Sequence, residues 1–188
     1  QLSKDDSEKW ISKILGTIDV IPDIAKGTKQ WYESEKDELK RFKNIIVIGY
    51  DKCFPAATEG ALKILETVQC CVRYYELEEF MHGIYHGIDK STLILALGNQ
   101  SRHLNRMVRL LGYLKEHKNA TTYLISQNKV TEHDFSYPFI EDSLFVSFEY
   151  LTVLQALGEL MCHDRGVDLY DTVDENFHEY MESYVYEK

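Results

Sequence analysis

The 188-residue sequence has no apolar run long enough to span a membrane and no cluster of basic residues. It carries 31 aspartates and glutamates against 21 lysines and arginines, which gives a formal net charge of −10 at pH 7. A nucleic-acid surface needs clustered cations that replace counterions, so this composition argues against a nucleic-acid partner. With 44% hydrophobic and 12% aromatic residues, the sequence predicts a soluble globular protein without a membrane partner.

Cysteines are few and show no C-x-x-C spacing: Cys53, Cys70, Cys71 and Cys162. We expect the adjacent pair Cys70 and Cys71 to fall in a buried strand. Reduced thiols in a cytoplasmic protein are the simplest interpretation. No charged segment followed by an apolar one opens the chain, so nothing in the given sequence argues for secretion. Because the first residue is not Met, we expect a processed chain or a fragment of a longer protein.

Several catalytic signatures are also absent. The sequence contains no G-x-G-x-x-G, Walker loop, G-x-S-x-G or H-E-x-x-H motif. It therefore predicts no dinucleotide binding, no P-loop phosphate binding and neither serine hydrolase nor zincin chemistry. We predict no cofactor.

Two histidines, His82 and His86, have the four-residue spacing of a metal pair on a helix. Gly83 and Gly87 disfavour a helix there, so we predict a loop without a metal. His82 follows an acidic segment and is a candidate acid–base residue, with a solvated loop histidine as the alternative.

The most informative stretch begins with the apolar run Ile45–Gly49, which is typical of a strand buried on both faces. A turn at residues 50–52 follows, and Pro55 suits the first turn of a helix. We predict a helix from Phe54 to Val68. Its apolar positions recur at helical spacing: Ala57, Ala61, Leu62, Leu65 and Val68.

This predicted helix also carries a polar stripe, because Glu59, Lys63 and Glu66 fall at i, i+4 and i+7. In open α/β sheets, ligands bind outside the carboxyl ends of the strands, so a polar face on the helix that leaves such an end is well placed for chemistry. The alternative is a set of ordinary surface ion pairs.

The rest of the chain alternates between predicted helices and strands. We expect two helices before the first strand, Glu8–Lys26 with a break at Pro22 and an end at Gly27, and Thr28–Phe42. The other expected elements are strands Cys70–Tyr75, Thr92–Leu97, Thr121–Ile125 and Phe135–Ile140, and helices Gln100–Lys118 and Ser143–His163, the latter capped by Gly166. This alternation predicts a three-layer α/β/α fold with a mostly parallel, five-stranded sheet.

Two segments carry a resemblance to a known family: GYDKCFPAATEGALKILE at 49–66 and EFMHGIYHGID at 79–89. Together they resemble the second sugar isomerase (SIS) domain of glucosamine-6-phosphate synthase and its relatives, and the similarity extends from Ile45 to Gly166. The resemblance implies the flavodoxin-like SIS fold. We therefore divide the chain into a helical connector (1–43), a SIS domain (44–166) and a C-terminal tail (167–188), whose acidic and aromatic composition predicts docking on a neighbouring domain or subunit.

The resemblance also implies site residues. Glu66 would be the base that moves a proton between C1 and C2 of an open-chain phosphosugar, with Glu59 and Lys63 as supporting charges near the substrate. His82 would assist ring opening in the site of a neighbouring subunit, which implies a homodimer. We add Tyr50 and Ser101, from the loops after two predicted strands, as candidate substrate-binding residues.

The sequence departs from the synthase at two places. The synthase ends in a run with an active-site lysine, whereas the ending here, with NFHEYM at 176–181, resembles the fructosamine-6-phosphate deglycase branch. His178 is a candidate replacement for that lysine, with an exposed tail histidine as the alternative. The expected phosphate loop is reduced to GNQS, with Ser101 as its only hydroxyl, so the phosphate would be held by an N-terminal SIS domain missing from this chain.

The sequence therefore predicts the C-terminal SIS domain of a cytoplasmic phosphosugar isomerase or deglycase that acts on a sugar 6-phosphate or its amino-acid conjugate. Two alternatives stay open: the isomerase domain of glutamine-fructose-6-phosphate aminotransferase, and a non-catalytic sugar-phosphate-sensing module of a regulator. Residues upstream of Gln1 would distinguish the three functions: a second SIS domain would support the deglycase, an amidotransferase domain the aminotransferase, and a helix-turn-helix the regulator.

Overall fold

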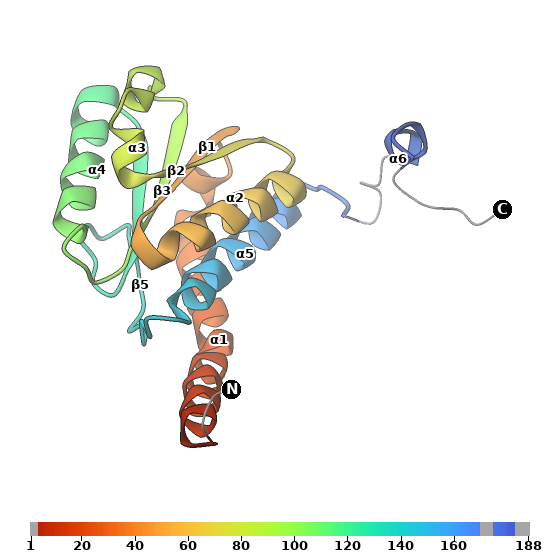
Figure 1. Cartoon of the computed structure of the whole chain (residues 1–188). Helices are drawn as coiled ribbons and strands as arrows, with labels where there is room; N and C mark the ends of the chain where they lie inside the picture. Colours follow the sequence, from red (N-terminus) through yellow and green to blue (C-terminus); the bar gives the residue numbers. More distant parts are fainter. Residues whose placement is uncertain (1–3, 170–174, 183–188) are drawn as a thin grey trace.

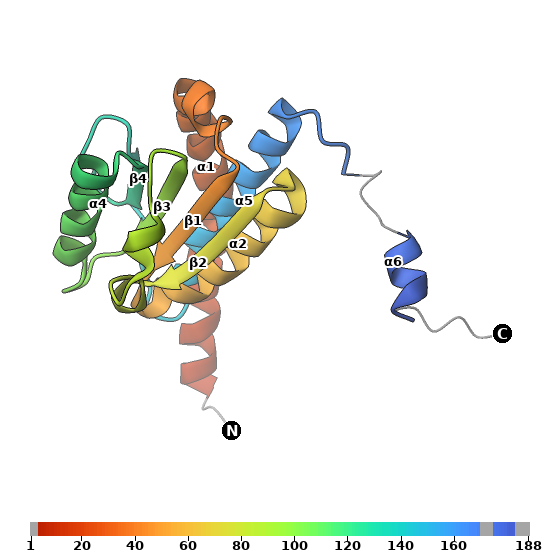
Figure 2. The same cartoon turned by 90° about the horizontal axis from the view of Figure 1, so that it is seen from above.

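The computed structural model describes residues 4–169 and 175–182 and is built around one five-stranded parallel sheet (Figures 1 and 2). The strands lie in the order β2-β1-β3-β4-β5. They are β1 (Asn44–Gly49), β2 (Cys71–Glu76), β3 (Thr92–Gly98), β4 (Thr121–Ser126) and β5 (Phe135–Ser136). Every neighbouring pair is parallel, which confirms the predicted three-layer α/β/α fold.

Helices cover both faces of the sheet and enclose two hydrophobic cores (Figure 2). On one face lie α1 (Lys4–Leu39), α2 (Phe54–Val68) and α5 (Val146–Asp164). On the other lie α3 (Leu77–Phe80), the 3-10 turn η2 (Ile84–Gly87) and α4 (Leu104–Lys118). The remaining described elements are the 3-10 turn η1 (Asp51–Cys53) and α6 (Glu175–Tyr180). Residues of α2 and of the segment carrying His82 therefore lie on opposite faces.

The two predicted N-terminal helices are one continuous helix, α1, so the predicted end at Gly27 is wrong. Pro22 also lies inside it. Packing across the junction overrides these local signals: a Cβ on Gly27 would lie 3.7 Å from the Phe135 ring, and Thr28 donates a 2.9 Å hydrogen bond to the carbonyl of Ile24. The carboxyl half of α1 thus belongs to the core of the α/β body.

Two predictions about strands are also wrong. Cys70 and Cys71 are not a buried pair, because β2 is an edge strand on which Cys71 is exposed. The predicted strand at Phe135–Ile140 is reduced to Phe135–Ser136. Pro138 has no N–H to donate, and Phe139 donates its N–H to the nearby carbonyl of Tyr137, so sheet pairing stops.

Exposed apolar side chains gather in two places on the helices. Leu62 and Leu65 of α2, which the helical spacing placed with the core positions, are 44% and 42% exposed. The amino half of α1 presents a second stripe at helical spacing: Ile11, Ile14, Leu15 and Ile18. Both are unusual on a monomer surface and mark places where another surface could pack. No helix among the described residues is long and apolar enough to cross a membrane.

Candidate functional site

The carboxyl ends of β1 and β3 form the topological switch point of the sheet, where α/β proteins bind ligands. Tyr50 follows β1, and its hydroxyl donates a 2.6 Å hydrogen bond to the carbonyl of Asn99 after β3. The Tyr50 side chain is only 1% exposed, and burial raises its pKa. In the described structure Tyr50 therefore joins the two loops, and its role in substrate binding stays a prediction.

Ser101, the other candidate from these loops, lies near Tyr50. Its hydroxyl accepts a 3.1 Å hydrogen bond from the backbone N–H of His103. The His103 ring lies 5.8 Å from the Tyr50 ring and 3.8 Å from a carboxylate oxygen of Asp51. His103 was not singled out from the sequence, since only the return of β3 to β1 brings it here.

The loop after β3 already holds a carboxylate. Glu141 accepts a 2.8 Å hydrogen bond from the backbone N–H of Gln100 and another of 2.8 Å from the Tyr150 hydroxyl. Its own backbone has a φ of 53°, a left-handed conformation that is uncommon for a glutamate. The backbone N–H of Gln100 is therefore already paired within the chain.

Glu149 fixes the backbone of that loop. It is fully buried and accepts hydrogen bonds from the backbone N–H groups of Ile140 (2.7 Å) and Glu141 (2.8 Å). Burial raises the pKa of this carboxyl, and the two N–H groups oppose the shift. Neither Glu141 nor Glu149 was found from the sequence, because their partners lie eight or more residues away.

The polar stripe of α2 forms as predicted. The Lys63 ammonium nitrogen lies 2.8 Å from Glu66 and 3.6 Å from Glu59. The three side chains are between 37% and 48% exposed, and the hydrogen bond to Glu66 is the largest cause that raises the pKa of Lys63. Leu62 and Leu65, from the same helix, are exposed as well.

Glu66 does not lie at the carboxyl edge of the sheet. It is in the last turn of α2, twelve residues after Phe54, so at 1.5 Å per residue it is about 18 Å along the helix from its start. The stripe thus runs from Glu59 near the switch point back along the outer surface of the molecule. The described chain alone does not enclose Glu66 in a pocket.

His82 lies in the turn between α3 and η2, and no α-helix joins it to His86, as Gly83 and Gly87 predict. Its side chain is exposed, and its backbone N–H donates to the carbonyl of Glu79 at 3.0 Å. This segment packs in the core shared with α4, whereas α2 packs in the other core. The sheet therefore separates His82 from Glu66 within one chain.

His178 lies on α6, which stands apart from the α/β body in both views (Figures 1 and 2). The structure therefore brings Tyr50 and Ser101 together at the switch point, and Glu59, Lys63 and Glu66 together on α2. It does not bring His82 or His178 to either group within one chain.

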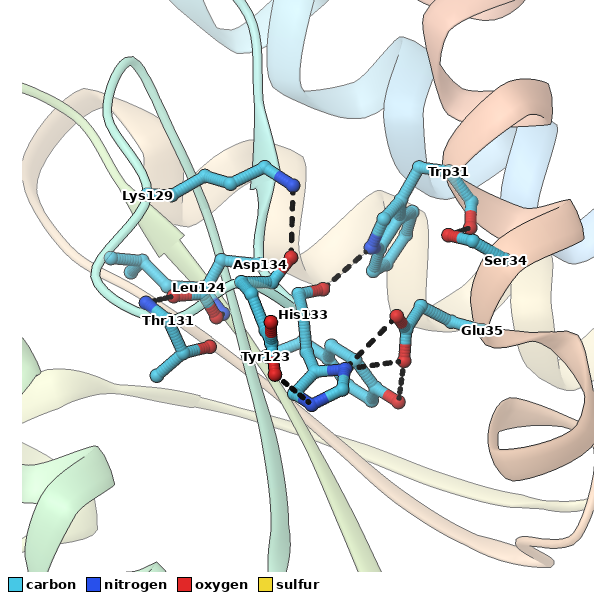
Figure 3. Close-up of polar contacts among 10 residues, drawn as sticks. Trp31, Ser34, Glu35, Tyr123, Leu124, Lys129, Thr131, His133 and Asp134 are labelled. Atoms are coloured by element: carbon cyan, nitrogen blue, oxygen red, sulfur yellow. Dashed lines mark hydrogen bonds and ion pairs between the residues drawn. The ribbon is translucent and has the colours of Figure 1, made fainter.

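A second polar cluster, outside these groups, fastens α1 to the sheet (Figure 3). The Glu35 carboxylate lies between the His133 ring and the Tyr123 hydroxyl, at 3.0 and 3.1 Å. Trp31 donates its indole N–H to the carbonyl of His133 at 2.7 Å, and Asp134 accepts three backbone N–H groups of the adjoining loop and strand. The contacts of Glu35 and Trp31 link α1 to residues 88 to 102 positions away, and those of Asp134 fix the local loop, so the cluster is explained by its structural role.

Comparison with known proteins places the site in context. The chain is 26% identical over 172 residues to the isomerizing glutamine–fructose-6-phosphate aminotransferase of Wigglesworthia glossinidia brevipalpis, a match that covers 87% of this chain and 28% of that enzyme. It is also 31% identical over 108 residues to the enzyme of the same name from Buchnera aphidicola, covering 55% of this chain and 18% of that one. The matches thus span 28% and 18% of the lengths of these curated relatives.

Solved structures give a similar result. A protein assigned as a phosphosugar isomerase from Clostridium difficile 630 superposes with a TM-score of 0.86 at 27% identity, over 96% of this chain and 51% of that one. A protein assigned as a sugar-binding protein from Salmonella typhimurium LT2 gives a TM-score of 0.74 at 28% identity, over 84% of this chain and 48% of that one. Residues 38–132, half of the sequence, match the family described as the SIS domain. The resemblance seen in the sequence is confirmed, and the chain belongs to the SIS domain family.

Proposed function

We propose that this chain is the C-terminal SIS domain of a cytoplasmic phosphosugar isomerase or deglycase, acting on a sugar 6-phosphate or its amino-acid conjugate. Glu66 is the base of the proton transfer, Glu59 and Lys63 hold the substrate, and His82 assists ring opening. The similarity to an assigned phosphosugar isomerase over nearly the whole chain supports the substrate class. The four free cysteines suit a reducing compartment.

The observation that carries this proposal is the Glu59–Lys63–Glu66 stripe, bordered by exposed Leu62 and Leu65. A surface that packed on these leucines would remove water from the stripe. Proton transfer by a carboxylate is more efficient when burial moves its pKa toward neutrality. The N-terminal SIS domain is the proposed source of that surface, and the exposed stripe at Ile11–Ile18 offers it further apolar contact.

The separation of His82 from Glu66 by the sheet supports a homodimer. His82 can serve a Glu66 site only if a second copy presents it. A two-fold dimer would supply both sites equally, because its interface uses the same surface on each copy.

The occupied loop after β3 supports the assignment of the phosphate to the other domain. Glu141 already accepts the hydrogen bond from the backbone N–H of Gln100, so this N–H is not open to a phosphate. The hydroxyl of Ser101, the only one in this loop, already accepts a hydrogen bond from the backbone N–H of His103.

One alternative has an observation in its favour. Both curated relatives described above are isomerizing aminotransferases, which favours the isomerase domain of such an enzyme. The NFHEYM ending favours the deglycase instead.

The test is to assay the full-length protein with an amino-acid conjugate of a sugar 6-phosphate, and separately with fructose 6-phosphate and glutamine. Cleavage of the conjugate supports the deglycase, and hexosamine formation supports the aminotransferase. If the protein turns over neither of these substrates, nor any other sugar 6-phosphate, an enzymatic role is rejected.

A further inference from the structure

A groove of about 580 Å³ follows the outer face of α4, beside the turn that carries His82. Its floor is apolar and aromatic, formed by Met81, Tyr85, Leu110 and Tyr113. Tyr85 and Tyr113 meet edge to face with their ring centroids 6.4 Å apart. The volume of this groove and its mainly apolar and aromatic lining are typical of a binding site.

Three arginines line the same groove: Arg102, Arg106 and Arg109. The Glu78 carboxylate holds Arg106, with a 2.9 Å hydrogen bond, and Arg102 contacts the ring of His103 at 3.1 Å. Arg109 has no hydrogen-bond or ion-pair partner among the residues that the structure describes. The groove is therefore a positive patch on a chain whose net charge is −10.

The segment after α5 has the complementary character. Residues 167–188 contain seven carboxylates and one lysine. Within this segment α6 and the residue after it expose Phe177, Tyr180 and Met181 by 56%, 88% and 55%. These three positions are i, i+3 and i+4, which share one face of a helix. Glu179, at i+2 from Phe177, is exposed on the other side of this helix, and Glu182 is exposed after the helix ends.

We propose that α6 of one copy docks in the arginine groove of a second copy of this chain. An amphipathic helix that lays its apolar face in a groove is a common mode of recognition. Phe177 and Tyr180 would pack on the aromatic floor, and the net negative charge of residues 167–188 would be attracted to Arg102 and Arg109. The contact extends the homodimer proposed above but uses none of the residues proposed for proton transfer.

The arrangement of the fold indicates that the α6 in the arginine groove comes from a second copy rather than from the same chain. The tail leaves from the end of α5, and α4 lies on the opposite side of the molecule in both views (Figures 1 and 2). A second copy brings the two surfaces together without passing the tail around the sheet.

Sedimentation velocity of the whole chain, from about 1 to 100 µM, tests the proposal over the range expected of a specific interface. We expect the wild-type chain to dimerise, and Arg109→Glu to weaken dimerisation at least about tenfold, because it places like charges in the contact. Lys115→Glu is the matched control: it makes the same charge change on α4 outside this groove, and the dissociation constant should change less than about twofold.

A charge exchange gives a second measurement. Glu179→Arg alone should also weaken dimerisation, and a mixture of Glu179→Arg with Arg109→Glu chains should form heterodimers. Circular dichroism confirms that each variant is folded. A wild-type chain that stays monomeric over this whole concentration range would overturn the proposal, even if α6 docks in the groove of its own chain. So would an Arg109→Glu chain that dimerises like the wild type. Neither result depends on whether the full-length protein turns over a phosphosugar.

Discussion

The ammonium nitrogen of Lys63 lies 2.8 Å from a carboxylate oxygen of Glu66, one turn away on the exposed side of α2. The hydrogen bond raises the pKa of Lys63, so the lysine remains a cation beside the proposed base. The pair is also an ordinary exposed ion pair, and only mutation separates the two roles.

The first prediction concerns the proposed base. In the full-length protein, Glu66→Gln keeps the size of the side chain but removes the proton acceptor. We expect turnover of the phosphosugar substrate to fall by about 10² to 10⁴, while substrate binding changes little. Steady-state kinetics together with a direct binding measurement test this expectation. Near-normal turnover would reject the base assignment, and a loss of folding would show that the stripe is structural.

Glu59→Gln is the comparison variant on the same face. Glu59 lies 3.6 Å from Lys63, so its loss should chiefly release the lysine and weaken substrate binding. We expect a higher KM and a smaller decrease in kcat than for Glu66→Gln. Equal decreases in kcat for the two variants would argue against distinct roles.

The close packing of α2 on α5 predicts a large effect of one methyl group. A Cβ on Gly60 would lie 2.2 Å from Cδ1 and 2.7 Å from Cβ of Leu154, so the helices would have to separate. We expect Gly60→Ala to lower the free energy of unfolding by about 1 to 3 kcal/mol, despite the better helix propensity of alanine.

Gly112→Ala is the control for that variant, since Gly112 lies within α4 and nothing approaches its Cβ position within 4 Å. It should raise the free energy of unfolding by up to about 1 kcal/mol. Urea denaturation of both variants gives the comparison. Two changes of the same sign would contradict the packing described for α2.

The attachment of α1 to the sheet gives a third prediction. Trp31→Phe removes the indole N–H that Trp31 donates to the carbonyl of His133. We expect a loss of about 1 kcal/mol in the free energy of unfolding, typical of a hydrogen bond between distant segments. Trp10→Phe, at a tryptophan with no hydrogen bond to its indole among the described residues, should cost less. Equal costs would mean that the ring, rather than its N–H, makes the contribution.

A fourth prediction concerns pH. A hydrogen bond from Lys13, which is the largest cause, and another from the backbone N–H of Leu144 hold the pKa of Asp142 below its usual value of 3.8. A folded-state pKa below the unfolded one stabilises the protein above the unfolded pKa, and this stability is lost as the pH falls through the folded pKa. Asp142→Asn should therefore be less stable than the wild type near pH 7, by less than about 1 kcal/mol. The difference should shrink as the pH falls below 3.8 and through the folded-state pKa, and it should also shrink in high salt. A difference that is constant with pH would assign the effect to the side-chain geometry.

Local signals were enough to predict much of the fold. The bounds of α2, Phe54–Val68, follow from Pro55 at its first turn and from the helical spacing of its apolar residues. The apolar runs at Ile45 and Thr92 became the two central strands because each is buried on both sides. The stripe on α2 was also predictable, since i, i+4 spacing on a helix requires no knowledge of the rest of the chain.

Features set by distant contacts were not predictable in this way. Gly27 ends a helix by its local preference, but here it lies against Phe135, 108 positions later. The exposure of Cys71 depends on β2 being the edge strand, which the strand order decides. Glu141 reaches Gln100 across 41 residues from a left-handed backbone, and no spacing rule indicates that pair.

The carboxylate of Glu141 has a consequence for ligand-linked stability. A protein gains stability from a ligand only when its native state has a vacant site for that ligand. At the loop after β3 the anion is covalently part of the chain, so the native state keeps it at any phosphate concentration. Adding inorganic phosphate should leave the Tm of this domain unchanged, and any phosphate-dependent rise in the Tm of a longer protein would report a site elsewhere.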